Sequence, residues 1–151
     1  MTEEVKQMIQ QILDSSDEDK VALGQQSLSR FLNGLKENGF NDDDLPKIIV
    51  AITRLFVSAD KHCSEKEYRF FKNVTEIDIS YQEFYEMTTG GADIEYVKSV
   101  LGFIVGLNKE ERVAVVLFGV ALLSSDNVVE YKELRLIDTI INAEYVHTEA
   151  N

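Results

Sequence analysis

Two pairs of acidic residues share one spacing in this chain. Glu67 follows Asp60 by seven residues, and Glu133 follows Asp126 by seven residues, so the second pair repeats the first at an offset of 66. Carboxylates that gather in one place repel each other unless protons, hydrogen-bond donors or a cation compensate them. Oxygen-rich sites suit hard cations such as Ca²⁺, Mg²⁺ or Mn²⁺. These four residues are therefore the candidate metal ligands.

The same acids have a structural interpretation. Ser64 and Glu67 have the spacing of a capping box, in which each side chain accepts a hydrogen bond from the other residue's backbone. Each Asp can likewise accept amides from its own tight loop. In the second copy Glu130 stands where the capping serine would be, so this explanation covers Glu133 less well. Both interpretations stay open at the level of sequence.

The residues around the acids repeat at the same offset. Residues 51–74 align with residues 117–140, with apolar residues opposite apolar ones and with identical pairs at Ser58/Ser124, Lys66/Lys132 and Arg69/Arg135. A repeat at a fixed offset reports architecture before any local pattern does. We expect residues 48–74 and 114–140 to form two superposable helix–loop–helix units.

Helical patterns run through nearly all of the chain. Apolar residues recur at intervals of three and four, and the single proline, Pro46, can occupy a first helical turn. We predict an all-α domain of about eight helices. The first covers about residues 3–14, the second ends near Asn38 before a left-handed Gly39, and Gly102 and Gly106 allow a close helix contact. The expected parts are N-terminal helices 1–44, a first repeat 45–91, a second repeat 92–145 and a short tail.

Composition excludes several classes of partner. The chain has 151 residues, with 27 acidic against 15 basic, and a formal net charge of −12. Such a charge repels phosphate backbones and anionic membrane surfaces. One cysteine rules out an internal disulfide framework, and the longest apolar run, 113–123, is too short to cross a bilayer. Without a signal-like N-terminus, we expect a cytoplasmic protein.

Signals of catalysis are weak. The sequence has no phosphate-binding glycine loop and no nucleophile elbow. His62 and Cys63 are adjacent, but Cys63 aligns with Val129 of the second copy, which predicts a small hydrophobe facing the core. An EF-hand loop starting at Asp60 would need a bidentate acid where Phe71 stands. We expect a protein that is not an enzyme.

An apolar helix ending in Asp, a short loop, and a Glu seven residues after the Asp, present twice, resembles the TerB-like helical family of tellurite-resistance proteins. The resemblance covers about residues 45–141. It implies a bacterial, all-α domain of two pseudo-symmetric halves, a role in stress response, and acidic residues gathered at the junction, for which metal binding has been proposed. The family usually has Gly after the Asp, whereas this chain has Lys61 and Asn127. Lys tolerates a left-handed turn less well than Asn, so we expect the first loop to differ in shape.

Two hypotheses about function follow. In the first, the chain is a TerB-like stress-response module that binds a divalent cation through Asp60, Glu67, Asp126 and Glu133. In the second, it is a protein-interaction or scaffold module, and the acids only cap and turn helices. A divalent cation bound to the folded state would raise its stability, whereas a partner-binding surface would leave stability indifferent to chelator.

Overall fold

A computed structural model describes residues 2–58, 63–89, 94–126, 129 and 133–141, and every regular element in them is a helix. This confirms the all-α prediction. Residues 133–141 form a last helix, which we call the final helix. The others are α1 (Glu3–Asp14), α2 (Asp17–Glu37), α3 (Leu45–Ser58), α4 (Glu65–Thr75), α5 (Tyr81–Thr89), α6 (Ile94–Val105) and α7 (Lys109–Ser124).

Local sequence signals set the helix ends. The side chains of Thr2, Ser16, Ser64 and Asn108 each accept a backbone N–H three residues on, and so cap α1, α2, α4 and α7. After α2, Gly39 has a φ of +92°, a left-handed conformation that glycine adopts without strain. The ends of the first two helices therefore lie where the sequence predicts them.

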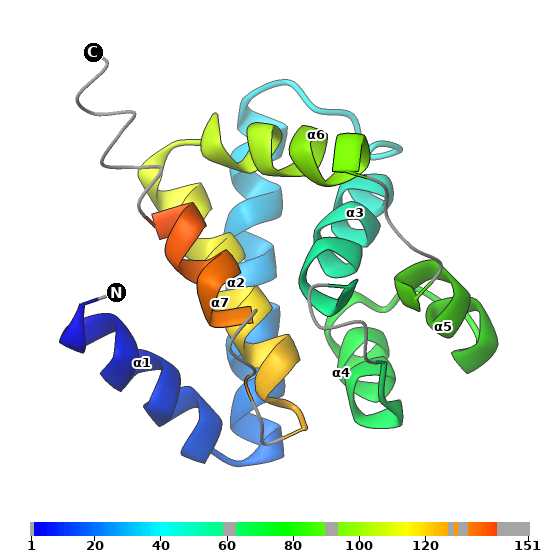
Figure 1. Cartoon of the computed structure of the whole chain (residues 1–151). Helices are drawn as coiled ribbons and strands as arrows, with labels where there is room; N and C mark the ends of the chain where they lie inside the picture. The colour runs from blue at the N-terminus through cyan, green and yellow to red at the C-terminus, as the bar shows by residue number, and fades with distance from the viewer. Residues whose placement is uncertain (1, 59–62, 90–93, 127–128, 130–132, 142–151) are drawn as a thin grey trace.

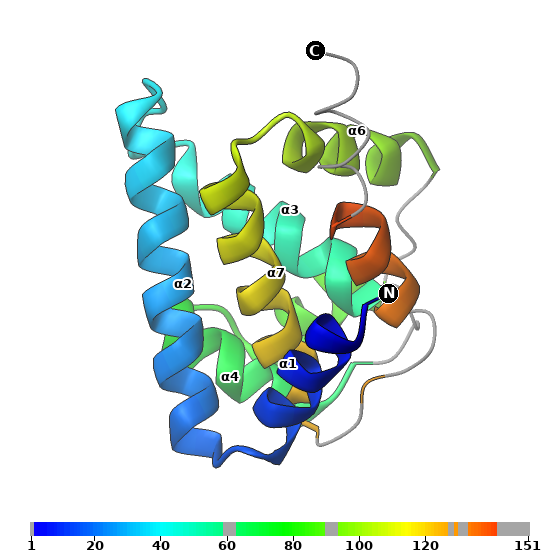
Figure 2. The same ribbon diagram turned by 90° about the vertical axis from the view of Figure 1, so that its left-hand side faces the viewer.

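Helices α2 and α7 pack along each other, with α7 at the centre of the molecule and α2 along one edge in Figure 2 (Figures 1 and 2). Helix α1 and the final helix lie on one side of this pair, α3, α4 and α5 lie on the other, and α6 runs across one end (Figure 1). The core joins all of these elements. Its most deeply buried side chains include Phe56, Phe71, Phe84, Leu122 and Ile137, each 0% exposed.

Close helix packing occurs at a different glycine from the predicted ones. A Cβ at Gly119 of α7 would overlap the ring of Phe56 in α3, so these helices approach as closely as they do because residue 119 has no side chain. Gly102 and Gly106 are both exposed, and a Cβ at Gly102 would meet nothing within 4 Å. The predicted close contact at these glycines was wrong, because α6 packs into the core through its opposite face, which carries Val100 and Ile104.

In each predicted repeat, part of the loop lies outside the described residues. Residues 48–74 run from α3 into α4, and residues 114–140 run from α7 into the final helix. The two loops contain residues outside the described part of the chain, so superposition of the two units stays a prediction. The boundary between the repeats at residues 90–93 also lies outside it. No helix in the described ranges has the length and apolar character needed to span a membrane.

Candidate functional site

The predicted capping box is present at the start of α4. The Oγ of Ser64 accepts the backbone N–H of Glu67 at 3.0 Å, and Oε1 of Glu67 accepts the backbone N–H of Ser64 at 3.1 Å. Glu67 is only 3% exposed. One of the four candidate ligands therefore has a structural role, because it satisfies an amide that the first helical turn would leave unpaired.

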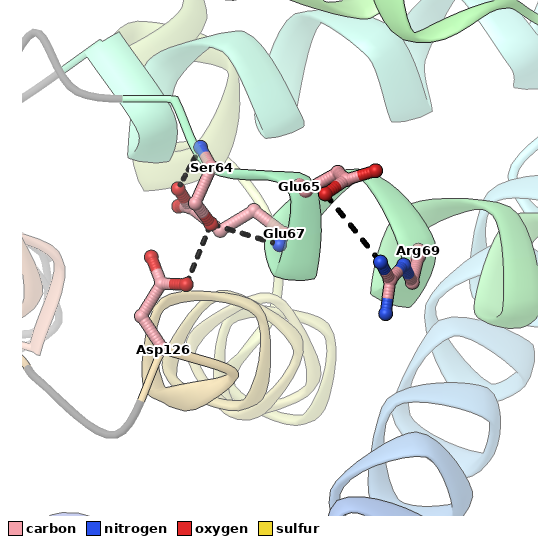
Figure 3. A network of polar contacts seen from close by, with 5 residues as sticks. All are labelled: Ser64, Glu65, Glu67, Arg69 and Asp126. Carbon is pink, nitrogen blue, oxygen red and sulfur yellow. Dashed lines mark hydrogen bonds and ion pairs between the residues drawn. The ribbon is translucent and has the colours of Figure 1, made fainter.

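The same serine joins the two repeats. The hydroxyl of Ser64 donates a hydrogen bond of 2.6 Å to Oδ1 of Asp126, which follows the end of α7 (Figure 3). The structure thus brings Glu67 and Asp126 to the same residue, Ser64, although Asp126 lies 62 positions further along the chain. Hydrogen bonds to an ionised carboxylate are shorter and stronger than neutral ones. A polar contact therefore links the two loops. We call the three residues that form it, Ser64, Glu67 and Asp126, the Ser64 latch.

Glu133, the second glutamate of the repeat, is 3% exposed at the start of the final helix. Lys20 of α2 is 1% exposed, and neither of these buried charges lacks an interaction partner. Asp60 lies outside the described residues. Among those described, no three His, Cys, Asp or Glu side chains are grouped so that they would hold a metal ion. The four-carboxylate metal site accordingly stays a prediction.

Cys63 packs partly buried against the core, in agreement with the prediction from its alignment with Val129. His62 lies outside the described residues. The start of α5 lies against α4, with the rings of Tyr68 and Tyr81 edge to face at 5.5 Å. Partial desolvation, followed by the negative charges of Cys63 and Glu65, raises the pKa of Tyr81 above its ordinary value. The surroundings of Tyr81 therefore favour the neutral form of its phenol.

Glu111 is a further buried acid, with one contact that is local in sequence and one that is not. Asn108 caps α7 at the backbone of Glu111, as its spacing predicts. Oε1 of Glu111 also accepts the side-chain amide of Asn38 at 3.1 Å, which ties the end of α2 to the start of α7. Glu111 lies against Gly34, where a Cβ would come within 2.6 Å of Oε1. The partner is 73 residues away, so no local pattern could have indicated it.

An apolar groove separates α1 from the final helix. It encloses about 440 Å³. We call it the α1 groove and define it by its lining: Lys6, Ile9, Gln10, Leu13, Val129, Leu134, Arg135 and Asp138. A second apolar hollow of about 170 Å³ adjoins the neighbouring flank of α1, where Val5 and Met8 face Ile140 and Ile141. The apolar stripe of α1 is thus only partly covered by the rest of the molecule.

Comparison of the chain with protein-family models, with curated proteins and with solved structures found no match.

Proposed function

We propose that the chain is a non-enzymatic binding module that recruits a partner protein through the α1 groove. The observation that carries this proposal is the groove itself, an apolar depression of about 440 Å³ between two helices. This volume falls within the usual range of ligand sites, about 300 to 1,000 Å³. Leu13 and Leu134 line it from opposite helices and offer apolar surface to an incoming side chain.

The occupant that fits the α1 groove is an amphipathic helix with acidic residues beside its apolar face. A groove between two helices accepts such a helix through apolar side chains spaced one turn apart. Lys6 and Arg135 line the groove, against a single lining acid, Asp138, and Lys6 also forms an exposed ion pair of 3.6 Å with Glu3 outside the lining. In a chain of net charge −12, this local excess of positive charge favours an acidic partner over a basic one.

The contacts of the Ser64 latch support a structural role for the repeated acids. Glu67 and Asp126 accept hydrogen bonds from Ser64, so the protein itself already compensates their charge. Binding of a divalent cation is the second candidate function. It is favoured by the convergence of Glu67 and Asp126 on one serine, together with the burial of Glu133. Metal-dependent stability separates the two candidates.

The resemblance of residues 45–141 to the TerB-like family extends the proposal to a biological setting. On this basis we assign the module to stress response in a bacterial cytoplasm. The resemblance rests on the helix, loop and Glu pattern quoted above, and the all-helical fold is compatible with it.

Binding of an apolar, anionic probe tests the groove directly. Anilinonaphthalene sulfonate should bind with an increase in fluorescence and shift the NMR signals of groove residues such as Gln10 and Leu134. Leu13→Gln and Arg135→Gln should weaken binding. Leu32→Gln, a matched change on α2 outside the groove, should leave binding unaltered. Shifts that lie elsewhere, or equal weakening by Leu32→Gln, would contradict the proposal.

A further inference from the structure

A third pocket, lined mainly by charged and polar residues, lies between the beginning of α2 and α4, beside the end of α7. It encloses about 190 Å³. Asp17 and Lys20 line it from α2, Lys66 and Arg69 line it from α4, and Ser125 closes it at the end of α7. Figure 3 shows that Glu65 and Arg69 lie away from the contacts of Ser64. The pocket adjoins the Ser64 latch at Ser125, which precedes Asp126, but it shares no lining residue with the latch or with the α1 groove.

Helical spacing explains why the basic residues meet there. Lys66, Arg69 and Asn73 lie at positions i, i+3 and i+7 of α4, so they share one face of that helix. Asp17 and Lys20 have the same three-residue spacing at the start of α2 and face them. Phe70 supplies an apolar surface within the pocket.

The charge of this pocket is opposite to that of the whole chain. Three basic residues and one acidic residue line it, whereas the chain carries 27 acidic against 15 basic residues. Lys20 is 1% exposed, so its ammonium group is withdrawn from water and acts across a medium of low dielectric constant. It also has partners within the protein, so the exposed side chains of Lys66 and Arg69 are the cations available to a ligand.

We propose that this pocket binds the phosphate group of a small molecule. A guanidinium and ammonium groups are the side chains that recognise phosphate oxygens, and the guanidinium can do so with two parallel hydrogen bonds. The volume of about 190 Å³ accommodates a phosphate group with little of its substituent.

Glu65 is the built-in competitor for Arg69. Its Oε2 lies 3.4 Å from a guanidinium nitrogen of Arg69, and both side chains are about two-thirds exposed (Figure 3). An ion pair so exposed contributes little to stability. A phosphate in the pocket would share Arg69 with Glu65 or replace Glu65 as its partner. Neutralising Glu65 and neutralising Arg69 should therefore have opposite effects on phosphate binding.

A titration followed by NMR at constant ionic strength tests the site. Inorganic phosphate and phenyl phosphate are added in place of chloride, and the amide signals of residues 17–21 and 66–73 are followed. Both probes should give saturable shifts confined to these residues. Tighter binding of phenyl phosphate would identify a phosphate ester as the natural source, and tighter binding of inorganic phosphate would identify the free ion.

Variants with exposed side chains make the test specific. Arg69→Gln should raise the dissociation constant about tenfold, the loss expected of one hydrogen bond between charged groups. Glu65→Gln should lower it by about twofold to fivefold, as expected from removing an exposed ion-pair competitor. Lys98→Gln, the same charge change at an exposed position on α6, should leave it unaltered. Absence of saturable binding, or equal weakening by Lys98→Gln and Arg69→Gln, would overturn the proposal.

Discussion

The hydroxyl of Ser64 donates a 2.6 Å hydrogen bond to the carboxylate of Asp126, and this bond between residues 62 positions apart connects the loops of the two repeated sequences. The same hydroxyl oxygen accepts the backbone N–H of Glu67 at the start of α4. One side chain thus serves as a helix cap and as a link between the two halves of the chain. Both acids it contacts belong to the repeated motif, so the motif contributes to tertiary structure whatever else it does.

Ser64→Ala should destabilise the protein more than Ser80→Ala. Both serines form a reciprocal box with the glutamate three residues on, but only Ser64 also bonds to Asp126. Loss of a cap costs about 1 kcal/mol, and loss of a hydrogen bond to a charged group adds about 1.5 to 3 kcal/mol. Urea unfolding of the two variants measures the difference, and the excess should disappear in an Asp126→Ala background. Equal losses in both variants would argue against the latch.

Chelator should leave the melting temperature unchanged, because Glu67 and Asp126 already accept hydrogen bonds within the protein. If instead a divalent cation binds with a micromolar dissociation constant, a millimolar excess would stabilise the fold by about 4 kcal/mol. Melting is compared with Ca²⁺, Mg²⁺, Mn²⁺ and chelator, in the native chain and in Glu133→Gln. A stabilisation by any of these ions that Glu133→Gln abolishes would establish the metal site in place of the structural role.

Gly119→Ala and Gly102→Ala should change stability in opposite directions. A methyl group at residue 119 collides with Phe56, and overpacking of a core costs about 1 to 3 kcal/mol. At residue 102 the methyl group enters open space, so the better helix propensity of alanine should stabilise by about 1 kcal/mol. Chemical denaturation of both variants provides the measurement. Stabilisation by Gly119→Ala would show that α3 and α7 are not in the described contact.

Tyr81 should ionise at higher pH than free tyrosine, since desolvation and the neighbouring Cys63 and Glu65 raise its pKa. A raised pKa in the folded state means that the contribution of the neutral phenol to stability is present below the ordinary value of 10.0 and declines above it. The difference between the ultraviolet titrations of the native chain and of Tyr81→Phe isolates this phenol. Ionisation at or below the pH of free tyrosine would contradict this environment.

The helices were predictable because their signals are local. The Ser16 cap, the left-handed Gly39 and the Ser64–Glu67 box each depend on residues within a few positions of one another, and all are present. The apolar pattern that starts at Ile94 predicts a helix to Leu107, whereas α6 ends at Val105. Periodicity alone therefore fixes the existence of a helix more closely than its end.

The site was less predictable because its contacts are not local. The contact between Ser64 and Glu67 is local and predictable, but only the packing of α4 beside the end of α7 brings Asp126 to Ser64. The burial of Lys20 and the contact between Glu111 and Asn38 likewise depend on which helices become neighbours. The α1 groove depends on how far α1 and the final helix stay apart, which no spacing of apolar residues along one helix determines.

Photocrosslinking from within the α1 groove tests the proposed function most directly. Gln10 lines the groove and is exposed, so a photoreactive amino acid at this position should crosslink to a partner protein in cells. The adduct should contain a helical segment with acidic residues beside its apolar face, and Leu13→Glu should abolish it by adding charge to the groove. The same photoreactive group at exposed Gln82 on α5, outside the groove, should not give this adduct. An adduct that forms equally from both positions, or that survives Leu13→Glu, would contradict partner binding through the α1 groove.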